Sequence, residues 1–245
     1  MRDLGITISN SLKYSSHCSE VAKKASIRAN LILRALRTSH TETLILAFKV
    51  FVRPLLEYCT TVFSPLFVKD ANVIERVQRQ YIRRVYARNN LHQCTYRERL
   101  KSDKVNLDTL ELRRAKFDML MIYKMFHGVV DLPISQFFLH VQNDRYVRAR
   151  HDYTIQSLVR AKCRVMQDYF FNRVVNVWNN LPKECVCAKS VYIFRNKINM
   201  IAENKLLPNR VSLLRNDTSE NCRVVRCKCR VPNVQLKTCQ IVVCK

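Results

Sequence analysis

The stretch from Asp70 to Val85 reads DANVIERVQRQYIRRV, and its pattern decides the fold class of the chain. Its apolar side chains recur every three or four residues, which is the spacing of one face of an α-helix: Ile74, Val77, Tyr81 and Val85. Arginines project about half a turn away from this stripe: Arg76, Arg79 and Arg83. A helix of this kind packs its apolar stripe against a core and exposes positive charge on the other side.

Helical spacing of apolar residues extends to most of the chain. It predicts further helices over residues 16–37, 108–127, 165–180 and 190–204. Ser39–Glu42 has capping-box spacing and opens another helix, which Pro54 should end or kink. Asp108–Glu111 is a second capping box, and Gly128 closes the helix that it opens. Asp3–Ser9 reads as a short strand. With only two glycines to form tight turns, the chain is expected to be mainly α.

Composition indicates a globular protein with a polyanionic partner. The 245 residues are 48% hydrophobic, so the chain can bury most of its unfolded surface. Its 43 Lys and Arg against 19 Asp and Glu give a net charge of +24. Nucleic acid is the first candidate to neutralise that charge, followed by an anionic membrane surface and an acidic protein. An ordinary basic protein with dispersed charge is the alternative.

Two compositional features bear on the compartment. No stretch approaches the length of about 18 uncharged apolar residues that a bilayer requires, since Lys49 interrupts the run from Leu44 to Val52. The start of the chain does not read as a secretion signal, and the 11 cysteines are scattered through apolar segments of a chain too large to need a disulfide scaffold. We therefore expect an intracellular protein, nuclear or cytoplasmic, that is not secreted.

A series of short motifs occurs in a recognisable order over roughly residues 2–200. They are Asp3–Gly5, Val52–Tyr58, Phe63–Pro65, Ile74–Arg79, Tyr96–Leu100, Leu110–Arg114 with Asp118, Phe171–Arg173 and Val177–Pro182. The series resembles the region after the palm in LINE-type, non-long-terminal-repeat retrotransposon reverse transcriptases. Ile74–Arg79 is the most specific motif, because it is similar to the Ile-Glu-x-Val-Gln-Arg helix of that family.

The resemblance implies an organisation in three parts. Residues 1–90 would be the thumb-like, bundle-like end of a reverse transcriptase domain. Residues 91–205 would be a C-terminal helical region, and residues 206–245 an irregular basic tail that contains cysteines. Trp178 has apolar neighbours at helical spacing and is expected in the core rather than as a platform for stacked bases.

The thumb-like role would be to grip the backbone of RNA, DNA or an RNA–DNA hybrid, with no membrane and no small-molecule substrate involved. Arginine suits phosphate because its planar fork donates paired hydrogen bonds. Arg76, Arg79 and Arg83 would contact phosphates, flanked by Arg84 and Arg88. The alternative is that these arginines form a solvated helix face that offsets nearby acids. Weaker candidates for the same surface are Arg34, Arg37, Arg53, Arg97 and Arg99. Arg113, Arg114 and Lys116 have two open interpretations, a larger footprint or helix packing through salt bridges with Asp118 or Glu111.

Catalysis cannot be transferred from that family. Its polymerases hold two metal ions on palm carboxylates that include an adjacent Asp-Asp pair. This chain has ten aspartates and none of them are adjacent, so we expect no enzyme and no cofactor, with Mg²⁺ implied only for the missing palm. The spacing of Cys222, Cys227, Cys229, Cys239 and Cys244 also argues against zinc.

Three functions remain open. The leading expectation is a truncated retrotransposon reverse transcriptase product that binds RNA or DNA without regard to sequence. The first alternative is a fragment of a complete RNA-directed DNA polymerase whose palm lies upstream of Met1. The second is a co-opted helical module that binds an acidic protein.

Overall fold

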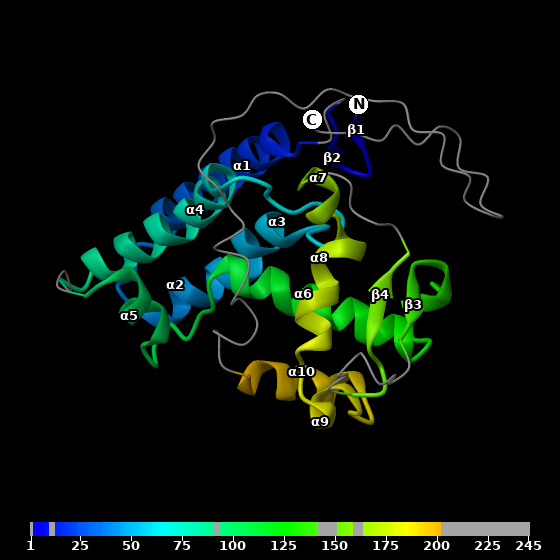
Figure 1. Cartoon of the computed structure of the whole chain (residues 1–245). Coiled ribbons are helices and arrows are strands. Elements are labelled where there is room, and N and C mark those ends of the chain that lie inside the picture. Colours follow the sequence, from blue (N-terminus) through cyan, green and yellow to red (C-terminus); the bar gives the residue numbers. More distant parts are fainter. Residues whose placement is uncertain (1, 10–12, 91–93, 142–150, 159–163, 202–245) are drawn as a thin grey trace.

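The computed structural model describes residues 2–9, 13–90, 94–141, 151–158 and 164–201, and these residues are mainly helical (Figure 1). The expected mainly α fold class is confirmed. The expected irregular tail over 206–245 lies outside the described residues.

The N-terminal strand is in fact a hairpin. Strand β1 (Arg2–Asp3) pairs in antiparallel register with β2 (Ile6–Thr7). Leu4 and Gly5 form the turn with φ angles of 44° and 84°, and two consecutive positive values are the geometry of the tight turn that matches strand twist. The prediction of one strand over Asp3–Ser9 is therefore wrong, because the alternating pattern hides a turn at its second and third residues.

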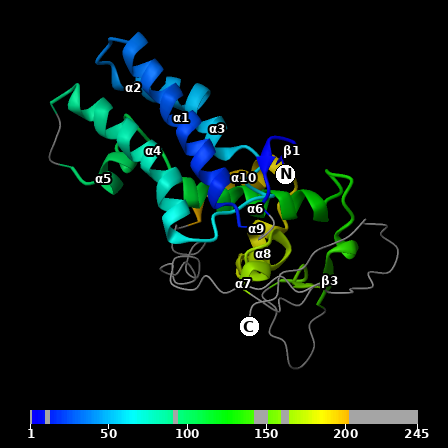
Figure 2. The same ribbon diagram turned by 90° about the horizontal axis from the view of Figure 1, so that it is seen from above.

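Two long parallel helices organise the first half of the chain. Helix α1 (Ser15–Ala35) lies beside α4 (Val68–Ala87), as both views show (Figures 1 and 2). At their N-terminal ends the hydroxyl of Ser15 donates a hydrogen bond of 2.6 Å to the carboxylate of Asp70. At their C-terminal ends Arg88 donates to the carbonyl of Leu36 at 2.6 Å.

Three consecutive helical segments connect α1 to α4. Helix α2 (Thr41–Ala47) continues into the π-helical segment η1 (Phe48–Val52) and then into α3 (Arg53–Glu57). Pro54 lies in the first turn of α3, where the backbone N–H that proline lacks is not needed for a helical hydrogen bond. Proline therefore does not end the helix at this position. The helical path therefore runs through Pro54 as successive α-, π- and α-helical segments, and both π-helical turns and prolines are usual positions of helix bends.

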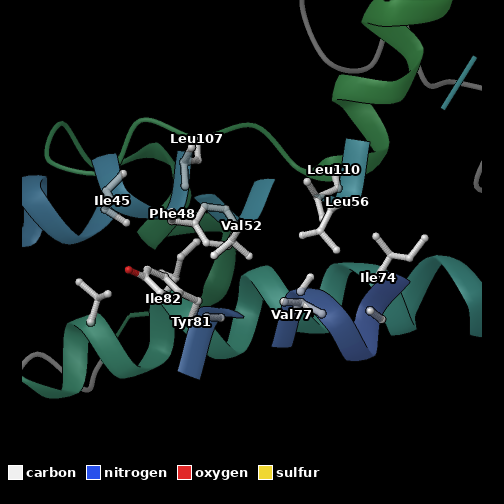
Figure 3. Packing of buried hydrophobic residues seen from close by; sticks show 14 of the residues in the cluster. Ile45, Phe48, Val52, Leu56, Ile74, Val77, Tyr81, Ile82, Leu107 and Leu110 are labelled. Atoms are coloured by element: carbon white, nitrogen blue, oxygen red, sulfur yellow. The ribbon is translucent and has the colours of Figure 1, made fainter. Parts of the chain in front are cut away.

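The apolar faces of these helices meet in a first hydrophobic cluster. Figure 3 shows Ile45, Phe48 and Val52 facing Tyr81 and its neighbours on α4. The phenol of Tyr81 donates a hydrogen bond of 2.7 Å to the carbonyl of Leu44. Figure 3 also shows Leu107 and Leu110 at this cluster, so its packing continues beyond residue 90.

A second hydrophobic cluster surrounds α6 (Leu110–Phe126) and Trp178. Trp178 is fully buried, stacks on Phe126 with ring centroids 5.2 Å apart, and donates to the carbonyl of Tyr153 at 2.9 Å. Its expected place in the core is confirmed. The remaining elements are α5 (Tyr96–Lys101), η2 (Ile134–Gln136), β3 (Phe138–His140), β4 (Ile155–Ser157), α7 (Arg164–Gln167), α8 (Phe170–Asn179), α9 (Lys183–Val186) and α10 (Val191–Met200).

The ends of several helices differ from the predictions. The helix expected over 165–180 is divided into α7 and α8, and the antiparallel pair β3–β4 was not predicted. The box expected at Ser39–Glu42 is not formed, since α2 begins after His40. Thr109, one residue later than predicted, caps α6 by accepting from the amide of Leu112 at 3.2 Å. A complete capping box occurs instead at Thr95–Glu98.

Candidate nucleic-acid interface

The outward face of α4 carries the strongest candidates. Arg76, Arg79 and Arg83 are all exposed and lie at helical intervals of three and four residues. Arg76 and Arg83 are two turns apart, which is about 10 Å along the helix axis, the rise of about three base pairs. Arg79 lies over the ring of Tyr96, with the guanidinium carbon 5.1 Å from the ring centroid. Among the residues that the structure describes, Arg76 and Arg83 have no ion-pair partner.

The two acidic residues of α4 point into the protein. Asp70 is 5% exposed and accepts the hydrogen bond from Ser15. Glu75 accepts from the phenol of Tyr96 at 2.5 Å and from the amide of Leu110 at 2.9 Å, and burial raises the pKa of its carboxyl. The outward face of α4, a helix described from end to end, therefore presents cations without a neighbouring carboxylate of its own.

Helix α1 extends this basic face. Arg84 of α4 donates a hydrogen bond to the side-chain oxygen of Asn30, which fixes the side of α1 that borders α4. Lys23 and Arg34 are exposed and lie seven residues before and four residues after Asn30, on the same side of the helix. We call the surface formed by Lys23, Arg34, Arg76, Arg79 and Arg83 the α1–α4 basic face.

Arg88 has a structural position. It donates to the carbonyl oxygens of Leu33, Leu36 and Thr38, at 2.6 Å for Leu36 and 3.0 Å for Thr38. The carbonyls of Leu33 and Leu36 belong to the last turn and cap of α1, where carbonyls lack partners inside the helix, and Thr38 lies in the segment that follows. Arg88 therefore ties the end of α4 to the end of α1, and its donors point at carbonyls rather than outward. Arg84, bonded to Asn30, lies at the edge of the α1–α4 basic face.

Arg53 and Arg113 lie together elsewhere, on a surface formed by α3 and α6. Arg113 donates twice to the carboxylate of Glu57, at 2.9 Å through one pair of atoms, and Arg53 lies 3.8 Å from the same carboxylate. Their placement does not bring them into the α1–α4 basic face.

Arg114 is inside the protein. It is 3% exposed, and burial lowers the pKa of its guanidinium while the carboxylates of Glu75 and Glu111 act in the opposite direction. Of its two open interpretations, only helix packing is compatible with this position, so its assignment as a phosphate contact is corrected. Asp118, one of the two acids expected as packing partners, pairs with Arg173 at 2.8 Å, and its charge also acts to raise the pKa of Arg114. Lys116 pairs with Asp108, at 2.6 Å.

Of the remaining weaker candidates, two are exposed and one is engaged in a packing contact. Arg37 and Arg97 are exposed, and Arg97 follows the tyrosine that lies under Arg79. Arg99 is half-buried, 5.3 Å above the ring of Tyr86. Arg97 is therefore placed at the margin of the α1–α4 basic face, and Arg99 is held in packing.

Sequence reasoning missed the polar network that these motifs build. Glu57 binds Arg113, Glu75 binds Tyr96, and Asp118 binds Arg173, which also donates to the carbonyls of Thr60 and Thr61 at 3.1 and 2.9 Å. The signal was present, because each of these acids stands inside one of the short motifs quoted above. Spacing along the chain does not indicate these pairs, because the partners of the three acids lie 21 to 56 residues away.

Two further classes of site find no support in the part of the chain that the structure describes. No group of three or more His, Cys, Asp or Glu side chains there is placed to hold a metal ion. None of its helices is both long and apolar enough to cross a membrane. The tail cysteines from Cys222 to Cys244 lie outside the described residues.

Comparison with known proteins identifies similarity to an uncharacterized chain. This protein is 26% identical over 130 residues to uncharacterized protein B0403.1 of Caenorhabditis elegans. The matching region is 53% of this chain and 63% of that relative, so the similarity spans less than two thirds of the relative's length. No known protein family and no solved structure matches the chain.

Proposed function

We propose that this protein binds the phosphate backbone of RNA, DNA or an RNA–DNA hybrid through the α1–α4 basic face, independently of sequence. The observation that carries the proposal is the separation of charge on α4. Its arginines Arg76, Arg79 and Arg83 are exposed, while its acids Asp70 and Glu75 are turned inward and hydrogen-bonded. A row of unneutralised guanidinium groups on a rigid helix fits a regular row of phosphates.

The proposal includes an origin for the chain as a truncated retrotransposon product. The motif series resembles the thumb and the region after it in LINE-type reverse transcriptases, and a parallel pair of basic helices suits a grip on duplex that leaves an active site. In this proposal the chain has no polymerase centre of its own and acts inside the cell, where nucleic acids are its partners. Its alternative is that a catalytic palm lies upstream, in which case the same face holds the product duplex.

The test is binding of the purified chain to an RNA–DNA hybrid across a salt series. For duplex, the slope of log affinity against log salt is about −0.9 for each phosphate contact. A variant with Arg76→Ala, Arg79→Ala and Arg83→Ala should therefore have a slope shallower by roughly two to three contacts. The matched control carries Lys104→Ala, Lys183→Ala and Lys189→Ala, which removes the same charge from exposed positions after α5 and on and after α9.

The control distinguishes binding through the α1–α4 basic face from attraction by the net charge of the whole chain. The proposal expects the control to keep the wild-type slope, since its three cations lie outside α1 and α4. Equal slopes for wild type and the triple-arginine variant would contradict the proposal. An equally shallower salt slope in both variants would indicate that binding depends on net charge alone.

A second candidate function is docking of a second copy of this chain. Exposed apolar side chains occur along α2, η1 and α3: Leu46, Val50, Phe51 and Leu55, with Phe51 54% exposed. Apolar side chains gathered on one surface are typical of contacts with proteins. Light scattering of wild type and of a variant with Phe51→Ser and Leu55→Ser would measure self-association through this surface. Unchanged, monomeric behaviour in both would count against docking between copies of the chain.

A further inference from the structure

A cavity of about 310 Å³ lies where α3, α6 and α10 meet, and it takes no residue from α1 or α4. The lining is contributed by Arg53 of α3, by Arg113 and Lys116 of α6, and by Arg195 of α10, together with apolar side chains. The volume is at the lower end of the range of about 300–1,000 Å³ that small-molecule sites occupy. Because none of its lining residues belongs to α1 or α4, the cavity is separate from the α1–α4 basic face.

The charges around the cavity do not balance. Two carboxylates neighbour its four cations: Glu57, which binds Arg113 and approaches Arg53, and Asp108, which binds Lys116. Arg195 is exposed and has no ion-pair partner within the described residues. The side chains of Arg53 and Arg113 are 21% and 22% exposed, so water screens their positive charges less than it screens the charges of fully exposed side chains. The cavity consequently retains positive charge that an anion would offset.

Apolar side chains line the cavity beside these cations. Phe117 and Leu120 line it from α6, and the guanidinium carbon of Arg113 lies 5.3 Å from the centroid of the Phe117 ring. A ligand that fits this lining carries an anionic group and, next to it, a flat apolar or aromatic group. Arginine at the anionic end favours a phosphate, because its fork matches phosphate oxygens in pairs.

We propose that this cavity binds a phosphate group attached to a base-sized aromatic group, the chemistry of a nucleotide. Arg195 and Lys116 hold the phosphate, Arg53 and Arg113 add positive potential, and the aromatic group lies against Phe117. A free nucleotide and the 5′-terminal nucleotide of a nucleic acid strand share this chemistry, and the ligands chosen for the test distinguish them. The inference does not depend on the function of the α1–α4 basic face.

The experiment is calorimetric titration of the full chain with adenosine monophosphate, adenosine and inorganic phosphate. The monophosphate should bind more tightly than either part alone. The variant Arg195→Ala, at an exposed position where folding is unaffected, should weaken its binding by about tenfold or more, as expected for loss of a hydrogen bond to a charged group. The triple-arginine variant of α4 is the matched control and should bind the monophosphate as wild type does.

Several results would overturn the proposal. Equal binding of adenosine and its monophosphate would mean that the cavity recognises no phosphate. Unchanged affinity in Arg195→Ala, or no binding of the monophosphate at millimolar concentration, would show that the cavity is not a nucleotide site. A short single strand with a 5′-phosphate is then compared with its 5′-hydroxyl form. A gain from the phosphate in wild type that is lost in Arg195→Ala identifies a strand end as the source, and no gain assigns the cavity to free nucleotides.

Discussion

The pair between Asp118 and Arg173 should be the most costly single polar contact to break. Its two side chains are 3% and 4% exposed, and Arg173 donates to both carboxylate oxygens, at 2.8 and 2.9 Å. The same guanidinium donates to the carbonyls of Thr60, Thr61 and Asp168. The pair therefore joins α6 and α8 to the segment that follows α3.

The variant Asp118→Asn keeps the shape of the side chain and removes its charge. Arg173 would then be buried without a counter-charge, a change that costs about 3–5 kcal/mol. In a domain of this size that loss lowers Tm by roughly 6–20 °C. Arg173→Met should cost a similar amount, and the double variant should cost less than the sum of the two by roughly 1–3 kcal/mol, because each residue of the pair exists to neutralise the other.

Urea unfolding of the four proteins measures these differences. Trp178 is the single tryptophan and reports on the second hydrophobic cluster, while far-ultraviolet circular dichroism reports on all helices. Both signals should move to lower urea together in Asp118→Asn, since the pair connects the two halves. A cost below about 1 kcal/mol, the range of an exposed pair, or strictly additive costs in the double variant would refute the reasoning.

Three further predictions concern buried groups. Tyr81→Phe removes the hydroxyl that donates to a carbonyl of α2 and should lower the free energy of unfolding by about 1 kcal/mol, measured by urea titration. Burial lowers the pKa of His17 and His151 in the folded protein below the ordinary 6.5, so the unfolded chain takes up protons first as pH falls. The free energy of unfolding should decrease from pH 7 to pH 5, and the decrease should be smaller when both histidines are replaced by glutamine. Burial raises the pKa of Cys185 to about 11, so iodoacetamide at pH 8 should label exposed Cys187 first and Cys185 only on unfolding, as peptide mass spectrometry can follow.

Helical periodicity was enough to predict the elements that dominate the fold. The stripe through Ile74, Val77 and Tyr81 corresponds to the buried side of α4, and the helix expected over 108–127 corresponds to α6. The outward position of Arg76, Arg79 and Arg83 follows from the same spacing, because a side chain half a turn from a buried stripe is exposed.

The unpredicted features depend on contacts between distant residues. Strands β3 and β4 pair across the 14 residues between His140 and Ile155, and no local pattern marks that register. Arg88 and Arg113 are drawn into structural contacts by groups 52 and 56 residues earlier in the chain, the carbonyl of Leu36 and the carboxylate of Glu57. Spacing along one helix says which side an arginine occupies, but not which acid or carbonyl the fold brings to it.

The most direct test of the account is arginine labelling with a dicarbonyl reagent, with and without RNA–DNA hybrid, read residue by residue by mass spectrometry. We expect protection of Arg76, Arg79 and Arg83 by a hybrid with 5′-hydroxyl ends, an unchanged labelling rate at Arg195, and no labelling of Arg114 until the protein unfolds. Unchanged labelling of the three α4 arginines in the saturated complex would contradict the claim that the α1–α4 basic face is where this protein holds nucleic acid.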